Sequence, residues 1–434
     1  MLRLLCTLVV ACPIGTNLGL LHLLWLLASG RLLATRGALF PGLAACGLPE
    51  RAIRRAWAAL GPGGWTRGQL LARWAATVAA EGRWQPHAHG GYRPVGVDVT
   101  GFWRPRLRGC PTTHDHGEAG RALPAIPVGL VARVGSAGGP RLAVPLAFVR
   151  ADAADPRPAA HARRLVRAAV GHCGADAALL RDAGFGPALL QAAGTSRSVV
   201  RVAKNRTFRR APPPPDGGRG RPPTRGAGVR PLPRADRGRP IPATAPDQRA
   251  PWQEDGALLR AAVWRDLVLP DAAPAAPACA VVALYDPRHR EPLRRAAPRP
   301  VTPQVLRDLS RDRWPVEQLP LAAKQLLGAA RQFVHAPETC QRWPELALLA
   351  GSVLTYVAAT AAPLPTGFWD RRPPPTPGRL RRALTRVPFP QDCPLPARIR
   401  ATAAVTVQLP TGFWGQRQRQ RDLEAPPIAR PEAA

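Results

Sequence analysis

The order of strand-like and helix-like segments in the first half of the chain constrains the fold most. An apolar run at Tyr92–Trp103 is followed by two further strand-like runs, residues 125–134 and 141–150, with a glycine-rich turn between them. Residues 161–169 then show helical periodicity, and a short apolar run follows within residues 177–185. Strands that alternate with a helix in this way predict an α/β fold.

Two of the strand-like runs carry an acidic residue. Asp98 stands in the middle of the first run, where an unpaired carboxylate is costly to bury, so we expect its side chain to face a metal ion, a partner or a cleft. Asp182 ends the last run and is followed closely by a glycine. The hairpin and helix between these runs allow the two acid-bearing strands to be neighbours. Both carboxylates would then lie together.

A third acid occurs with two basic residues at helical spacing. In Arg313-x3-Glu317-x6-Lys324, offsets of four and eleven residues place the three side chains within about 40° of one another on an α-helix. One carboxylate then lies between two cations, an arrangement that suits a metal ion beside a phosphate chain. A solvated helix face with incidental charges is the alternative interpretation of this spacing.

Pro315 and Pro320 complicate the helix that would carry this set. An interior proline costs about 3 kcal/mol and can kink a helix. The apolar pattern itself predicts a helix over residues 319–334. If the helix begins at Leu319, Glu317 precedes it, and the angular argument fails for that residue.

Three carboxylates form a donor set with a specific chemistry. Mg²⁺ and Mn²⁺ prefer hard oxygen ligands, and two such ions about 4 Å apart need a bridging carboxylate and one or two further acids. Two bound ions activate a water or hydroxyl nucleophile and stabilise the leaving oxygen of a phosphodiester. The sequence contains no evident Ser-His-Asp or Cys-His set. We therefore expect two Mg²⁺ or Mn²⁺ ions as cofactors.

The motif that ends at Lys324 resembles the Tyr-x2-Arg-x3-Glu-x6-Lys signature of cut-and-paste DDE transposases of the insertion-sequence-4 group. Val97-Asp98-Val-Thr100 and Asp182-Ala-Gly-Phe185 precede it in the family's order. About 135 residues separate Asp182 from Glu317, which leaves room for the family's β-rich insertion. The resemblance covers residues 1 to about 370. It implies an α/β fold with a ribonuclease H-like catalytic core that is interrupted by an insertion.

By this resemblance, the three acids are the catalytic metal ligands, and residues near the third acid contact DNA. The catalytic and metal-binding residues are Asp98, Asp182 and Glu317. The DNA contacts are Arg313, Lys324 and Ser310, where Ser310 replaces the family's tyrosine and lacks its aromatic ring. The implied reactions are hydrolysis at the transposon end, hairpin formation by the freed 3′-hydroxyl, reopening of the hairpin, and strand transfer into target DNA.

The charge of the chain favours a polyanionic partner. Its 434 residues include 61 Lys and Arg against 28 Asp and Glu, a formal net charge of +33. Such a field concentrates nucleic acid, so we expect double-stranded DNA as the partner. Only Lys204 and Lys324 are lysines, which indicates a high-GC coding bias and weakens any argument from arginine content alone. A lysine retained against that bias favours a chemical role for Lys324.

Residues 1–91 are predicted to form a helical DNA-binding region, because apolar residues recur in it at spacings of three and four. A helix, a turn that contains Gly47, and a second helix that carries Arg51, Arg54 and Arg55 fit a helix-turn-helix. An ordinary helical hairpin with a solvated basic face fits the same pattern.

Residues 206–277 are predicted to form an insertion in the catalytic core. Up to about residue 250 they are rich in Pro, Gly and Arg and contain little that can pack. Gly218-Arg-Gly-Arg-Pro222 resembles the core of an AT-hook, which lays arginines into the minor groove of DNA. Arg219 and Arg221 are therefore expected to contact DNA, either as a hook or as a basic loop against phosphate.

The remaining features concern the compartment and the tail. The eight cysteines are scattered without a Cys-x2-Cys pair, which fits reduced thiols in the cytoplasm. Residues 1–12 mimic a short secretory signal, but buried core helices explain them better. We expect no membrane association and a location on the bacterial nucleoid.

The tail, residues 362–434, contains Leu-Pro-Thr-Gly-Phe-Trp twice, which indicates a short duplication rather than a solenoid.

Together these observations predict a DNA transposase. Its ribonuclease H-like core spans residues 92–205 and 278–361, between the helical region and the tail. By the resemblance, two copies of the chain hold transposon ends with terminal inverted repeats, together with target DNA, in a synaptic complex. The alternatives are a decayed or repurposed DNA-binding protein without catalytic activity, and a hydrolytic nuclease without strand transfer.

Overall fold

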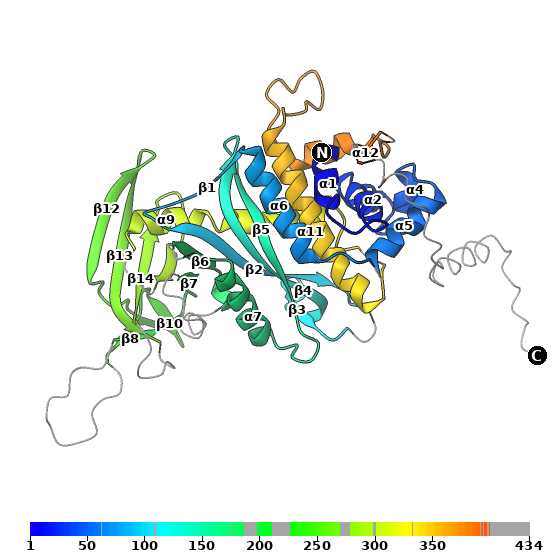
Figure 1. Cartoon of the computed structure of the whole chain (residues 1–434). Coiled ribbons are helices and arrows are strands. Elements are labelled where there is room, and N and C mark those ends of the chain that lie inside the picture. Colours follow the sequence, from blue (N-terminus) through cyan, green and yellow to red (C-terminus); the bar gives the residue numbers. More distant parts are fainter. Residues whose placement is uncertain are drawn as a thin grey trace, which may run out of the picture.

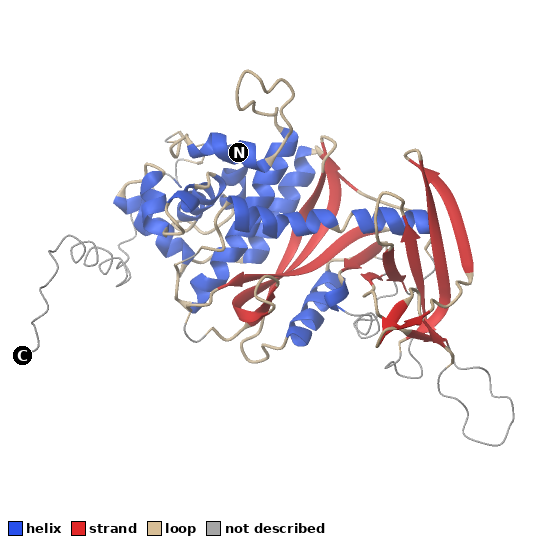
Figure 2. Cartoon of the chain, turned by 180° about the vertical axis from the view of Figure 1, so that it is seen from behind, coloured by secondary structure: helices blue, strands red, loops and turns tan. Residues whose placement is uncertain are grey.

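The computed structural model describes residues 1–399 except 62, 108–109, 175, 186–197, 211–225, 270–277, 298–300, 332, 391, 394 and 397–398. A layer of helices covers one end of a long sheet, and the sheet continues beyond that layer as a curved extension (Figure 1). Figure 2 shows the same division from behind, with the helices gathered at one side and the extended strands at the other. None of the described helices is long and apolar enough to cross a membrane.

The N-terminal region is helical, as its apolar periodicity predicts. Its helices are α1 (Leu2–Val9), α2 (Asn17–Ala28), α3 (Arg31–Ala34), α4 (Leu39–Ala45), α5 (Glu50–Leu60) and α6 (Arg67–Glu81). α2 is apolar around most of its circumference, and nearly all of its residues are buried, so it forms the centre of the layer. Thr66 and Gln69 form a capping box that fixes the start of α6.

The middle of the chain forms the covered part of the sheet. Its strands are β1 (Trp84–Pro86), β2 (Arg93–Trp103), β3 (Thr113–His116), β4 (Arg121–Ala137), β5 (Arg141–Arg150), β6 (Ala177–Arg181) and β7 (Ser198–Arg201). β2 pairs antiparallel with β4, and β4 pairs antiparallel with β5. On its other edge β2 pairs parallel with β6, which pairs parallel with β7. The order β5–β4–β2–β6–β7 makes a mixed sheet, and the prediction of an α/β fold is confirmed at this level.

Helices cover both faces of these five strands. α7 (Pro158–Gly171) packs on one face through Leu165 and Val166, which lie in a core with Val95 and Val97 of β2. On the opposite face, α6 contacts β5, and α11 (Pro337–Thr360) contacts β4 and β5. α10 (Trp314–Leu321) contacts β2, β4 and β5 on the same face. That face merges with the helical layer into the largest apolar core. β2 is therefore buried on both sides, and any polar group on it needs a specific partner.

The sheet continues past β7 through an antiparallel extension. Its strands are β8 (Phe208–Arg210), β9 (Gly228–Val229), β12 (Gln248–Glu254), β13 (Ala257–Val268), β14 (Cys279–Tyr285) and β15 (Leu293–Ala297), with β10 (Arg234–Asp236) and β11 (Arg239–Ile241) paired separately. β15 pairs with β7, and β14 and β13 follow in order. β14 and β15 fall in the segment assigned to the core by sequence, yet they pair within this extension.

Packing in the extension corrects the expectation that residues 206–250 contain little that can pack. Phe208 and Val229 are buried, and they lie in one apolar core with Trp264 of β13. On the other face of the extension, α9 (Pro303–Arg311) packs Leu306 and Leu309 against strands that include β13 and β14. Few apolar residues suffice here, because they pack against buried apolar side chains of β13 and β14 such as Leu267 and Val281.

The predicted helix over residues 319–334 is wrong in both of its bounds. α10 begins earlier, with Pro315 in its first turn, where a proline has no hydrogen bond to lose. Pro320 lies inside α10, and the chain then widens into a π-helix, η2 (Ala322–Leu326). Helical structure ends before Gly328, whose φ of 76° lies in the left-handed region. α12 (Pro377–Thr385) is a separate short helix that follows α11.

Candidate active site

One face of β2 presents a row of functional positions to α10 and η2. Side chains of a strand alternate between its two faces, and Val95 and Val97 point to α7. Gly96, Asp98 and Thr100 therefore face the other way, toward the helices that follow the extension. Each of these three residues meets a different part of the α10–η2 segment, which places Asp98 in the centre of the row.

Gly96 sets how closely α10 approaches β2. A Cβ atom at Gly96 would lie 2.2 Å from Cγ2 of Val316, a distance that real Cβ atoms do not reach. Val316 itself is buried. Glycine at this position therefore lets α10 lie directly on the strand, and it brings the residue after Val316, Glu317, next to Asp98.

Asp182 reaches the same place from β6. The parallel register pairs Val97 of β2 with Arg181 of β6, so the following residues, Asp98 and Asp182, are neighbours on one face of the sheet. The Oδ1 atom of Asp182 is buried and accepts no hydrogen bond from the part of the chain that the structure describes. The nearest cations to Oδ1 are Arg201 Nη1 at 3.8 Å and Arg313 Nη1 at 3.9 Å.

Arg313 connects two of the three acids. It directly precedes α10, and its guanidinium forms an ion pair with Glu317, four residues later, as well as the longer contact with Asp182. Glu317 lies in the first turn of α10. The proline at residue 315 therefore does not displace Glu317 from the helix, and Arg313 and Glu317 lie together as their spacing predicts.

Lys324 extends from η2 to the next position of the β2 row. Its Nζ donates a hydrogen bond to Thr100 Oγ1 at 2.6 Å and lies 4.5 Å from the ring centroid of Trp103. Burial lowers the pKa of Lys324 to about 8, and the negative charge of Asp98 opposes this shift. The lysine thus stays mostly charged at neutral pH and is close to losing its proton.

The electrostatics single out Asp98 among the acids. Burial raises the pKa of Asp98 to about 6, and the negative charges of Glu317 and Asp182 act in the same direction. A hydrogen bond from Val99 N–H and the charge of Arg313 oppose the shift without cancelling it. Three carboxylates on three separate elements therefore lie close enough for Glu317 and Asp182 to add to the effect of burial on Asp98.

A buried arginine lies beside this cluster. Arg295 of β15 donates from Nε to Ser310 Oγ at 2.9 Å, and Ser310 donates to Leu306 O at 2.7 Å. Burial lowers the pKa of Arg295 to about 9, and the charges of Arg313 and Arg201 add to this effect. Its Nη1 atom has no hydrogen-bond partner among the described residues. Ser310, which stands at the tyrosine position of the signature, thus positions a guanidinium instead of supplying an aromatic ring.

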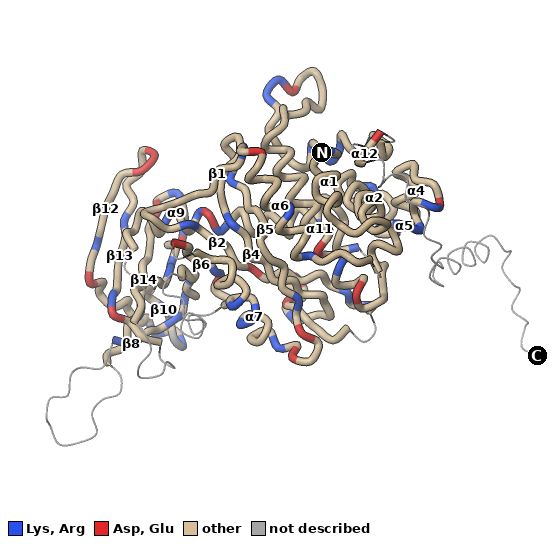
Figure 3. Tube along the Cα trace, in the orientation of Figure 1, with Lys and Arg blue, Asp and Glu red and all other residues tan. Residues whose placement is uncertain are grey.

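The other predicted DNA contacts lie apart from the acids. Arg51, Arg54 and Arg55 are on α5, within the helical layer at the right of Figure 1, while β2 and β6 cross its centre. Arg54 pairs with Glu50, and burial lowers the pKa of Arg55. Arg219 and Arg221 lie outside the described residues, as does the second copy of the tail hexapeptide. Figure 3 shows that Lys and Arg positions are spread along both the helical layer and the sheet and do not gather on a single element.

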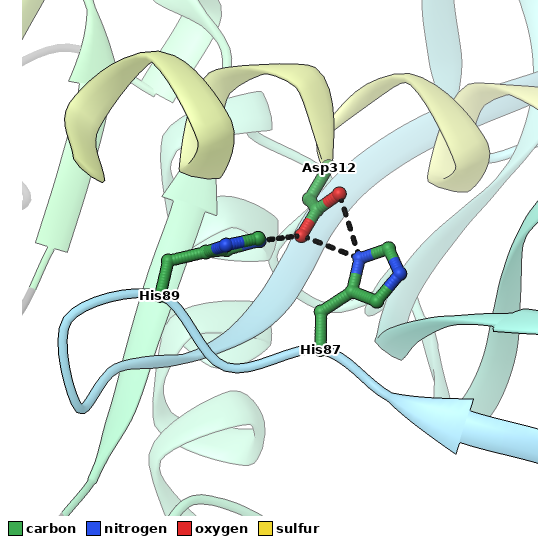
Figure 4. A group of neighbouring side chains, drawn as sticks. All are labelled: His87, His89 and Asp312. Carbon is green, nitrogen blue, oxygen red and sulfur yellow. Dashed lines mark hydrogen bonds and ion pairs between the residues drawn. The ribbon is translucent and has the colours of Figure 1, made fainter. Parts of the chain in front are cut away.

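Sequence reasoning missed a second carboxylate site on the other side of Arg313. Asp312 is fully buried and contacts His87 and His89 (Figure 4). Arg141 is its third partner. The His-x-His spacing of residues 87 and 89 was the only available signal. Asp312 itself lies in an Arg-Asp-Arg run that looks like a solvated helix face. Because Asp312 and Arg313 are consecutive, the contacts of Asp312 help to hold Arg313 at the acids.

Comparisons with known proteins add no family assignment. No protein-family model matches the chain, and no curated protein sequence matches it significantly.

Proposed function

We propose that this protein is a DNA transposase that cuts and joins DNA by a metal-dependent DDE mechanism. The observation that carries the proposal is the convergence of Asp98, Asp182 and Glu317 from β2, the end of β6, and α10. These acids are distant in sequence, and incidental surface charges have no reason to meet beside a buried strand. Perturbed carboxyl groups in such clusters are typical of functional sites.

The arrangement of the strands supports a ribonuclease H-like core for the proposed enzyme. A hairpin follows the first acid-bearing strand, a helix returns the chain, and the second acid ends the parallel neighbouring strand. The β-rich extension then intervenes before the helix of the third acid, as the resemblance to the insertion-sequence-4 group implies.

The carboxylates fit the proposed divalent ions. Asp98, Asp182 and Glu317 would supply only hard oxygen donors, which Mg²⁺ and Mn²⁺ prefer. The buried Oδ1 of Asp182 has no hydrogen-bond donor among the described residues, and burial together with the charges of Glu317 and Asp182 raises the pKa of Asp98. Two bound ions would supply activation of the attacking oxygen and stabilisation of the leaving oxygen.

The chain's own residues would bind and orient the phosphodiester. Arg313 and Arg295 place two guanidinium groups near the acids, and planar guanidinium groups suit phosphate oxygens. Contacts with Thr100 and Trp103 fix the position of the Lys324 ammonium group, so this group is preorganised before DNA binds. Asp98 loses its proton above about pH 6, so we expect activity to rise through that range.

Double-stranded DNA is the proposed partner. The formal charge of +33 attracts the phosphate backbone, and the N-terminal helices, including Arg51, Arg54 and Arg55 on α5, would add contacts away from the acids. Under this proposal the protein is associated with DNA in the cytoplasm, and a homodimer joins two transposon ends.

A plasmid assay tests the proposed function. The full-length protein is incubated with a supercoiled plasmid that carries the DNA flanking its coding sequence on both sides, with Mg²⁺, Mn²⁺ or EDTA. Strand breaks at the ends of that DNA and joined products in a target plasmid are expected only with metal. Binding without breaks would instead identify a non-catalytic DNA-binding protein. Breaks without joined products would identify a nuclease.

A further inference from the structure

Three potential metal ligands meet beside the acid cluster but separate from it. The ligand atoms of His87, His89 and Asp312 all lie within 4.8 Å of one another, and this is the only such group of His, Cys and acidic side chains in the described part of the chain. His87 Nδ1 and His89 Nε2 both point at Oδ2 of Asp312, at 2.9 and 2.7 Å (Figure 4). One carboxylate oxygen and two imidazole nitrogens therefore converge.

The groups around this trio resemble the outer partners of a metal site. Ser136 Oγ lies 2.6 Å from Nε2 of His87, on the side of the ring away from Asp312. If Nε2 donates its proton to Ser136, a neutral His87 presents a lone pair toward the carboxylate, and a cation between them removes the repulsion. Arg141 Nη1 donates to Oδ1 of Asp312 at 2.9 Å, which leaves Oδ2 for the shared centre.

The backbone holds the two histidines in place. His87 N–H donates to Val134 O of β4 at 3.0 Å, and His89 and Tyr92 exchange two backbone hydrogen bonds of 2.9 Å. Gly90 closes the turn between the latter pair with a φ of 55°, and a Cβ at Gly90 would lie 2.8 Å from Val305 of α9. The histidines are thus placed on a rigid segment, which favours metal binding.

We propose that His87, His89 and Asp312 bind a divalent transition-metal ion of the Zn²⁺ class. Two imidazole nitrogens and one carboxylate oxygen are a donor set that Zn²⁺ accepts with a fourth ligand from solvent, whereas Mg²⁺ prefers oxygen donors. At about 2.0–2.2 Å from zinc, tetrahedral ligand atoms lie roughly 3.3 Å apart. The two histidine nitrogens lie 2.9 and 2.7 Å from Oδ2 of Asp312, and all three ligand atoms lie within 4.8 Å of one another, so side-chain rotations can open the space for an ion.

This site has a structural consequence that is independent of the proposed enzymatic function. His87 and His89 follow β1, whereas Asp312 lies at the end of α9, directly before Arg313. A bound ion ties the β1–β2 connection to the α9–α10 junction.

Calorimetric titration of the EDTA-stripped full-length protein with Zn²⁺ tests the proposal. The conservative double variant His87→Gln/His89→Gln keeps amide donors for Asp312 but removes the imidazole ligands. The matched control is His114→Gln/His116→Gln, which removes two histidines from β3. With excess Mg²⁺ present to occupy the carboxylate cluster, we expect one tight Zn²⁺ site per chain in the wild type and the control, and its loss in the first variant. Visible absorption of Co²⁺ in the same proteins distinguishes nitrogen from cysteine ligation.

A second variant keeps the test valid if the double variant misfolds. Ser136→Ala removes the partner of His87 Nε2 and is expected to weaken Zn²⁺ affinity by roughly 10- to 100-fold without loss of folding. The proposal is overturned if the wild type binds no Zn²⁺, if the His87/His89 double variant retains the site, or if Ser136→Ala leaves the affinity unchanged. Asp312 would then be held by hydrogen bonds alone.

Discussion

Two acidic sites, one fully buried and one half-buried, lie on either side of the α9–α10 junction, and their charges are compensated differently. Asp312 is fully buried and contacts two histidines and an arginine, all within hydrogen-bond distance. Asp98 is mostly enclosed, yet its nearest charged neighbours include two further acids, which help to raise its pKa to about 6. The first site has the partners that a buried charge requires, whereas the second lacks them.

This difference in charge compensation indicates different roles for the two sites. The Asp312 site positions the α9–α10 junction, and the Asp98 site carries the proposed chemistry. A carboxylate with a full set of partners stabilises the fold even without a bound ion. A carboxylate in a cluster of like charges destabilises the metal-free fold and is poised to bind cations. Arg313 lies between the two sites and contacts the acids on one side, so the fully partnered site supports the unbalanced one.

The largest effect is expected from removing charge in the acid cluster. Asp98→Asn or Glu317→Gln should reduce metal-dependent DNA cleavage by roughly 1000-fold or more, because residues that act as one unit fail together. Salt-sensitive DNA binding should persist, and a gel assay measures both properties. Asp308→Asn, which alters an exposed acid on α9, is the matched control and should leave cleavage intact. Cleavage by Asp98→Asn at the wild-type rate would remove Asp98 from the catalytic set.

The next largest effect concerns the fully partnered site. Asp312→Ala leaves two histidines and Arg141 without their common acceptor, so we expect a loss of about 3–5 kcal/mol of unfolding free energy. Urea denaturation of the metal-free protein measures it. Glu50→Gln, which breaks the exposed pair with Arg54, should barely move the midpoint. An equally small shift for Asp312→Ala would mean that its partners do not stabilise the junction.

A smaller effect is expected where α10 rests on β2. Gly96→Ala introduces a Cβ that meets Val316, and overpacking of this kind costs about 1–3 kcal/mol. Val316→Ala in the same chain makes room, so the double variant should recover part of the stability and of the cleavage activity. Gly68→Ala on α6, where no atom lies within 4 Å of an added Cβ, is the control. Purely additive losses would show that Gly96 does not set the position of α10.

Local patterns predicted much of the covered sheet. The apolar runs and helical periodicity gave β5 its observed bounds, Arg141–Arg150, and placed β2 and α7 within a few residues of where they lie. Asp98 was identifiable because a lone acid in an apolar strand has few explanations. The Arg313 and Glu317 pair also follows from spacing, since residues four apart in a helix are neighbours.

Long-range partners were not predictable from local pattern. His87 and Asp312 are 225 residues apart, and nothing in the charged run around Asp312 indicates that it is fully buried. Phe208 and Val229 are isolated apolar residues among Pro, Gly and Arg, and only pairing with neighbouring strands buries them. The helix predicted over residues 319–334 was misplaced, because α10 already begins at Trp314 with Pro315 in its first turn, whereas the apolar pattern places the start at residue 319.

The smallest expected effect is a gain in stability on removing the charge of Asp98, whereas removal of Asp312 is expected to destabilise the protein. The folded pKa of Asp98 is about 6, above its ordinary value of 3.8, so folding favours the protonated form, and stability falls as the pH rises between these values. Asp98→Asn resembles that neutral form. It should match the wild type below pH 3.8 and exceed it by about 1–2 kcal/mol above pH 6, after allowance for solvent screening. Urea unfolding in EDTA at both pH values measures the difference, and added Mg²⁺ should favour the wild type instead. If Asp98→Asn destabilises the metal-free protein at pH 7.5, Asp98 is a fully partnered carboxylate like Asp312, and the contrast between the sites is wrong.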